Sequence, residues 1–97
     1  MRNIAIVTTD HAKRYVGQFV KHFAHKLPAE LAEDGLSGQV EFSAGVCRLG
    51  AADVVLSLEL DGPDDAMERL RDVVARHLSR FAFREELRIE WREVADN

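Results

Sequence analysis

Three strand-like runs, separated by short breaks, occupy residues 39–60 and constrain the fold more than any other feature of the chain. The runs are QVEFS (39–43), VCRLGA (46–51) and DVVLSLEL (53–60), and in each of them apolar residues recur at every second position. A period of two is typical of strands that bury one face. Because the breaks AG (44–45) and AAD (51–53) are short enough for hairpins, the runs predict an antiparallel meander.

Two amphipathic helices flank this meander. In the first, apolar residues fall at 12, 15, 16, 19, 20, 23, 24 and 27, which is helical spacing. We expect Asp10 to cap this helix, and Pro28 to end it at Leu27. The second helix begins in DGPDD (61–65), with Pro63 at its first position, and its apolar stripe predicts that it reaches about Phe81.

Three further segments complete the prediction. NIAIVTT (3–9) is apolar on both faces and predicts a well-covered strand. PAELAEDGLSG (28–38) is acidic and contains two glycines, so we expect a connection with one helical turn. LRIEW (87–91) predicts a last strand, with Leu87, Ile89 and Trp91 on one side.

The predicted order is therefore β-α-β-β-β-α-β in a single domain of residues 1–97. Each helix has one apolar stripe, and the meander and last strands each have one apolar face. The simplest burial is an α+β two-layer sandwich, with both helices on one face of a five-stranded, mostly antiparallel sheet. Polar residues of mixed charge are expected on the other face: Gln39, Glu41, Ser43, Arg48, Ser57, Glu59, Arg88, Glu90 and Arg92.

Charge and composition exclude several classes of protein. The net charge of −4 makes non-specific nucleic-acid binding a poor fit. No apolar run approaches the ~20 residues of a membrane span, and the N-terminus lacks the apolar region of a signal peptide, so we expect a cytoplasmic protein. Cys47 is the single cysteine, which allows no internal disulfide, and it is predicted to point inward.

One cationic helix is the exception in this acidic chain. Residues 1–27 hold five Lys and Arg residues against one acid, and KHFAHK (21–26) places two histidines among lysines. His22 and His25 are one turn apart, but a metal site needs about three converging ligands, and the neighbouring lysines would repel a cation. We therefore expect no metal and no cofactor. Two readings stay open, a solvated helix face and a cradle for a small anion. The cradle would use Arg14, Lys21, His22, His25 and Lys26.

The end of the second helix carries further candidates. His77 lies on the apolar stripe, where a histidine is usually buried with its ring donating to a backbone or carboxylate acceptor, but it could also respond to pH. Arg80 and Arg84 suit the negative end of the helix dipole, and they could also complete a pocket with the first helix. A catalytic role for His22 or His25 would require a nucleophile or substrate within hydrogen-bond reach.

Two motifs, RYVGQFVKHFAHK (14–26) and VVARHLSRFAFREEL (73–87), give the chain a recognisable resemblance. Together they resemble a family of small bacterial proteins of unknown function, found alone or fused to siderophore-interacting flavin reductases. The resemblance implies a fold like that of the TATA-binding protein and a role in handling iron chelates. The signature positions are Arg14, Tyr15, Lys21, His22, His25, Lys26, His77, Arg80, Phe81, Arg84 and Glu85.

These observations lead to one expectation for function and two alternatives. We expect a non-catalytic accessory domain that binds an anionic ligand, such as a siderophore-type iron chelate, at Arg14, Tyr15, Lys21, His22, His25, Lys26, His77, Arg80 and Arg84. The first alternative is an interaction module that forms a homodimer or docks onto a siderophore-interacting reductase. The second is a small enzyme that uses His22 or His25.

Overall fold

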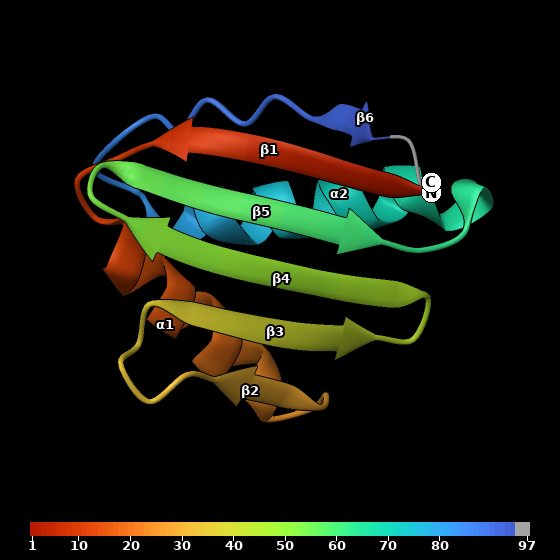
Figure 1. Cartoon of the computed structure of the whole chain (residues 1–97), viewed down its shortest axis with the longest axis horizontal. Helices are drawn as coiled ribbons and strands as arrows, with labels where there is room; N and C mark the ends of the chain where they lie inside the picture. The colour runs from red at the N-terminus through yellow and green to blue at the C-terminus, as the bar shows by residue number, and fades with distance from the viewer. Residues whose placement is uncertain (95–97) are drawn as a thin grey trace.

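The computed structural model describes residues 1–94 and contains one six-stranded sheet with two helices. The elements are β1 (Arg2–Thr8), α1 (Ala12–Ala24), β2 (Ala29–Leu31), β3 (Ser37–Phe42), β4 (Gly45–Ala52), β5 (Val55–Asp61), α2 (Asp64–Phe81) and β6 (Arg92–Val94). The strand order is β2-β3-β4-β5-β1-β6, and every pairing is antiparallel (Figure 1).

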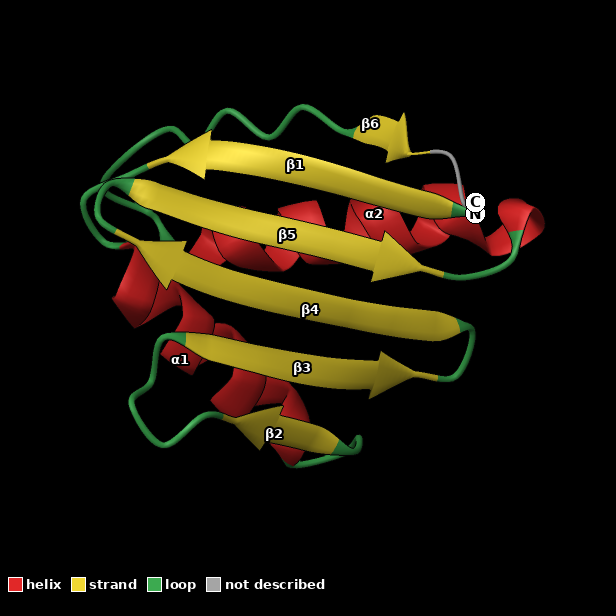
Figure 2. Cartoon of the chain, viewed as in Figure 1, coloured by secondary structure: helices red, strands yellow, loops and turns green. Residues whose placement is uncertain are grey.

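Both helices cover the same face of the sheet, as predicted (Figure 2). The alternating leucines of β5, Leu56, Leu58 and Leu60, point into the layer between sheet and helices and are fully buried. They meet the apolar stripes of both helices, which include Phe19 of α1 and Leu78 of α2. The two-layer α+β prediction is therefore confirmed, because one apolar sheet face and two apolar helix stripes bury one another.

The sheet has six strands where five were predicted, because the connection at 28–38 contains strand β2. Instead of a helical turn, Ala29 pairs with Val40 and Leu31 pairs with Gly38, at the edge of the sheet. Ala29 and Leu31 are half-buried against the core, and Glu30 between them is exposed. Three alternating residues are too short a pattern for periodicity to reveal.

The last strand is also displaced from its predicted place. Residues 87–91 run beside β1 in Figure 1 without belonging to a strand, and pairing begins only at β6, where Arg2 faces Val94. Leu87, Ile89 and Trp91 nevertheless pack against the core, as their alternation predicted. Side-chain alternation indicates which residues face inward, but it does not establish whether the backbone comes close enough to pair.

The helix ends differ from prediction in three places. Asp10 does not cap α1. The N-cap position of α1 is His11, whose backbone N–H donates to the Thr9 hydroxyl oxygen at 3.1 Å. α1 ends at Ala24 and not at Leu27, because a tighter turn ahead of Pro28 links the Lys26 N–H to the Phe23 carbonyl at 3.0 Å. Pro63 precedes α2 as its N-cap and is not its first helical residue.

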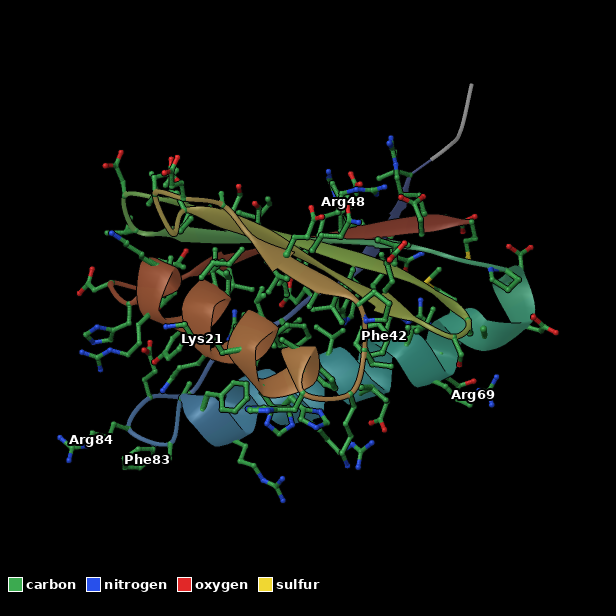
Figure 3. All side chains as sticks on the ribbon, turned by 90° about the horizontal axis from the view of Figure 1, so that it is seen from below. Lys21, Phe42, Arg48, Arg69, Phe83 and Arg84 are labelled. Atoms are coloured by element: carbon green, nitrogen blue, oxygen red, sulfur yellow. The ribbon has the colours of Figure 1, made fainter. Side chains whose placement is uncertain are left out.

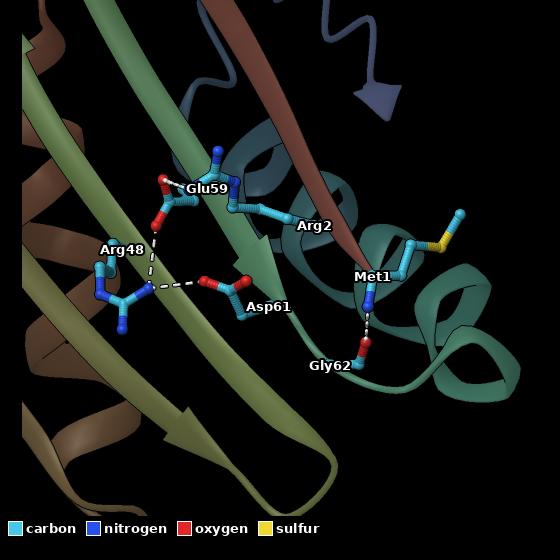
Figure 4. A network of polar contacts seen from close by, with 6 residues as sticks. All are labelled: Met1, Arg2, Arg48, Glu59, Asp61 and Gly62. Atoms are coloured by element: carbon cyan, nitrogen blue, oxygen red, sulfur yellow. Dashed lines mark hydrogen bonds and ion pairs between the residues drawn. The ribbon is translucent and has the colours of Figure 1, made fainter. Parts of the chain in front are cut away.

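The face of the sheet opposite the helices carries charged side chains of both signs, as predicted. Arg48 projects from this face (Figure 3), and its guanidinium contacts Glu59 at 2.9 Å and Asp61 at 2.7 Å (Figure 4). Exposed ion pairs of this kind contribute only about 0–1 kcal/mol each. The prediction that β1 is covered on both faces is wrong, because Ile6 is 60% exposed on this side. Within residues 1–94, neither helix is long and apolar enough to span a membrane.

Two glycines provide a matched test of the packing. At Gly45 an added Cβ would overlap the Asp61 carbonyl oxygen and lie 2.9 Å from Leu70 Cδ1. Gly45→Ala should therefore lower the free energy of unfolding by about 1–3 kcal/mol. At Gly17, inside α1, an added Cβ meets nothing within 4 Å. Gly17→Ala should stabilise the protein by about 0.5–1 kcal/mol, because alanine is the better helix former. Urea unfolding measures both changes, and equal signs would contradict the described packing.

Candidate functional site

The start of α1 and the end of α2 enclose a cavity of about 480 Å³, here called the first cavity. Three of the predicted site residues line it, namely Arg14, Tyr15 and Arg84. The other lining residues are Asp10, His11, Gln18, Phe81, Ala82, Phe83 and Glu85. Of the two arginines that were expected to complete a pocket with the first helix, Arg84 lines this cavity and Arg80 does not.

A carboxylate fixes the far wall of the first cavity. Glu85 follows α2, and its side chain accepts a short hydrogen bond from the Tyr15 hydroxyl and another from the Thr9 hydroxyl, at 3.0 Å. Tyr15 and Thr9 are both buried, so these contacts join the segment after α2 to both α1 and the end of β1. Thr9 was not among the predicted site residues, and no local motif marks a contact between residues so far apart in sequence.

The same contacts shift two pKa values in opposite directions. Burial, with the hydrogen bond to Glu85, raises the pKa of Tyr15 to about 12. The hydrogen bond from Tyr15 lowers the pKa of Glu85 below its ordinary value. At neutral pH the phenol therefore keeps its proton and the carboxylate stays ionised, so the hydroxyl donates to a charged acceptor.

A second cavity, of about 470 Å³, lies on the other side of Arg14 and Gln18, which line both cavities. The charged residues that line it are Lys13, Arg14 and Lys21, and all of them are cations. Leu31 of β2 and Gly35 close the opposite side. The sequence analysis missed this cavity, since its far wall is the unpredicted strand and the loop that follows it.

Predicted residues His22 and His77 lie together elsewhere, between the two helices. Their ring centroids are 5.1 Å apart, and both rings contact Phe23. His22 also meets Phe81, with centroids 5.6 Å apart. His77 donates from Nδ1 to the Val73 carbonyl at 2.7 Å, which is the backbone partner that its position predicted, although the residue is only half-buried.

The remaining predicted residues, His25, Lys26 and Arg80, are exposed and line neither cavity. Their positive charges nevertheless affect the pKa of His22. Partial burial, followed by His77, His25, Arg80 and Lys26, lowers the pKa of His22. The predicted single cationic site is therefore divided into the two cavities, a histidine-aromatic cluster and an exposed helix end.

The structure also bears on metal binding and nucleophilic chemistry. Among residues 1–94, no three His, Cys, Asp or Glu side chains converge as metal ligands. Cys47 is fully buried in β4, as predicted, and burial raises the pKa of its thiol to about 12. A thiol that is neither ionised nor accessible cannot act as a nucleophile.

Comparison with known proteins identifies relatives of unknown function. Residues 4–92 match the family described as "Uncharacterized protein conserved in bacteria (DUF2218)". The NMR structure of PA4090 from Pseudomonas aeruginosa shares 36% sequence identity, with a TM-score of 0.77 and 94% of each chain covered. No curated protein gives a significant match. The predicted likeness to the TATA-binding protein stays a prediction.

The Tyr15–Glu85 contact should give stability within a definite pH window. The lowered pKa of Glu85 means that its contribution is lost as pH falls through that pKa, and the raised pKa of Tyr15 means that the contribution is lost as pH rises toward about 12. Tyr15→Phe should therefore reduce the free energy of unfolding by about 1–3 kcal/mol at pH 7, and by less at pH 3. The carboxyl pKa of Glu85, followed by NMR, should rise in this variant. An unchanged pKa would contradict the contact.

His22 should make the protein less stable in mild acid. Because its pKa is lowered in the folded state, the unfolded chain takes up this proton first as pH falls through about 6.5. The free energy of unfolding should therefore fall between pH 7 and pH 5, and His22→Phe should flatten part of that fall. His25→Phe, the same change one turn later, is the matched control and should leave most of the fall in place. Urea unfolding at each pH measures the free energy of unfolding. Equal pH profiles for the two variants would contradict the assignment of this pH dependence to His22.

Proposed function

Because the chain belongs to the uncharacterised bacterial family DUF2218, we propose a function from its geometry: a non-catalytic domain that binds a small anionic ligand along α1. The site is the α1 groove, defined as the first and second cavities together, with Arg14 and Gln18 between them. The observation that carries the proposal is the charge of the second cavity, where Lys13, Arg14 and Lys21 occur without a lining acid.

Three cations on one wall favour an anion for two reasons. Exposed like charges repel one another, and an anion among them relieves that repulsion. Each charge-assisted hydrogen bond to a carboxylate or phosphate adds about 1.5–3 kcal/mol. After the cost of association, two or three such bonds correspond to dissociation constants on the order of micromolar to millimolar.

The ligand class follows from the chemistry of these side chains. Guanidinium and ammonium groups bind carboxylate, phosphate and catecholate oxygens, and an anionic ferric siderophore carries such oxygens on its surface. The chain's resemblance to proteins found fused to siderophore-interacting flavin reductases narrows this class, and we propose a siderophore-type iron chelate as a candidate ligand, with a siderophore-interacting reductase as the partner that would accept or deliver it. Tyr15 lines the first cavity, and we assign it a structural role there because its hydroxyl already donates to Glu85.

A second candidate function is self-association through the open face of the sheet. Ile6 is 60% exposed there, beside a hollow of about 250 Å³ that Ile4 also lines. Arg48 and Glu59 on the same face have opposite charges, which suits contact with a second copy. Sedimentation velocity over a range of concentrations tests this candidate. A dimer that Ile6→Lys dissociates would support it, and a monomer at every concentration would remove it.

Calorimetry on matched variants tests the anion proposal. Ferric citrate, ferric catecholate, ferric hydroxamate and inorganic phosphate are titrated into the protein in low salt at pH 6 and pH 8. At least one should bind, and Arg14→Gln and Lys21→Gln should each weaken it by about tenfold, because each removes one charge-assisted contact.

Lys26→Gln is the control, since it removes the same charge from the C-terminal end of α1 without touching either cavity. Its affinity should stay within about twofold of the wild type, because an exposed charge outside the groove is largely screened. The absence of heat from all four probes would refute the proposed function. So would a Lys26→Gln variant that loses as much affinity as Arg14→Gln.

A further inference from the structure

One large apolar side chain in the wall of the first cavity faces water. Phe83, in the segment after α2, is 78% exposed. In Figure 3 Phe83 and Arg84 project from this segment, away from the helix that precedes it. Covering a phenylalanine ring removes apolar surface from water, so a ligand that contacts this ring gains affinity.

The segment that carries Phe83 is held on both sides. Before it, the Ala82 N–H donates to the Leu78 carbonyl at 2.9 Å, and the Ala82 side chain is buried. After it, Glu85 accepts hydrogen bonds from Tyr15 and Thr9. Because its neighbours are fixed, the backbone that carries the ring has little entropy left to lose on binding.

Further groups around the ring suit a planar aromatic ligand. The Arg84 guanidinium carbon lies 5.4 Å from the centroid of the Phe83 ring, within the range of a cation-π contact. The rings of His11 and Phe81 also line this cavity. Aromatic pairs stabilise a complex beyond the effect of the area that they bury.

The charges of the α1 groove differ between its two ends. The first cavity contains the carboxylates of Asp10 and Glu85 as well as two arginines, so it gives a ligand's negative charge little net attraction. The lining charges of the second cavity are all positive. The two cavities adjoin at Arg14 and Gln18, which line both, so a ligand that reaches from Phe83 to Lys21 crosses from the first cavity into the second. A ligand that fits both ends is therefore elongated, with a neutral ring at one end and a negative charge at the other.

We propose that the α1 groove takes an elongated aromatic anion, with its ring against Phe83 and its anionic end among Lys13, Arg14 and Lys21. This inference rests on the proposed function, since it assigns a ligand class to the same groove. Phe83 selects the aromatic end, and the cations select the charged end.

Calorimetry with three small probes tests this assignment. They are 4-phenylbutyrate, with ring and charge; butyrate, which lacks the ring; and 4-phenylbutanamide, which lacks the charge. The wild type should bind 4-phenylbutyrate at least about tenfold more tightly than either of the others, because each of those loses one end of the groove. Inorganic phosphate reports anion binding separately from the aromatic contact.

The variants Phe83→Ala and Ile6→Ala form a matched pair, since both shorten an exposed apolar side chain and lie on opposite faces of the molecule. Phe83→Ala should weaken 4-phenylbutyrate by about tenfold and leave phosphate within about twofold, and Ile6→Ala should change neither. Circular dichroism melting confirms that both variants are folded.

Two results would overturn the aromatic assignment while leaving the anion site in place. In one, phosphate binds but 4-phenylbutyrate binds no more tightly than butyrate. In the other, Phe83→Ala weakens phosphate and 4-phenylbutyrate equally. If no anion binds at all, phosphate included, the proposed function fails and the assignment fails with it.

Discussion

The carboxylate of Glu85, which accepts hydrogen bonds from Tyr15 and Thr9, determines where the segment after α2 lies. The periodicity of α2 does not by itself direct residues 82–87 toward the start of α1, and these contacts act together with the buried Ala82 and the packed Leu87. With them, Phe83 and Arg84 come to line the same cavity as His11 and Arg14. A partly buried hydrogen-bond network is well suited to this role, since leaving its partners unsatisfied costs more than an exposed contact contributes.

The charges that line the α1 groove differ between its two ends. α1 carries cations on the side that faces β2, where no acid lines the second cavity, and acids enter only at the end that Asp10 and Glu85 share. The protein as a whole is acidic, with a net charge of −4. An anion is therefore repelled by most of the surface, and the cationic groove on one helix is the more selective for it.

The sequence predicted the layers and the faces better than it predicted the site. Periodicity identified the buried leucines of β5 and the apolar stripes of both helices, because within one strand or helix the side on which a residue lies follows from its spacing to near neighbours in sequence. It missed β2, which is three residues long, and it placed the last strand at residues 87–91, where the side chains alternate but the backbone is unpaired. Most of the site residues were chosen from the first helix and the rest from the end of the second, and they separated because contacts such as Thr9 with Glu85 join residues distant in sequence.

The outermost strands of the sheet, β2 and β6, are each three residues long. An edge strand exposes unpaired backbone donors and acceptors that can template the addition of another chain, and long, flat edges are where sheet proteins aggregate. Here the strand at each edge is short, so it offers an added strand few positions for pairing. Short edge strands therefore limit the addition of foreign strands to the described sheet.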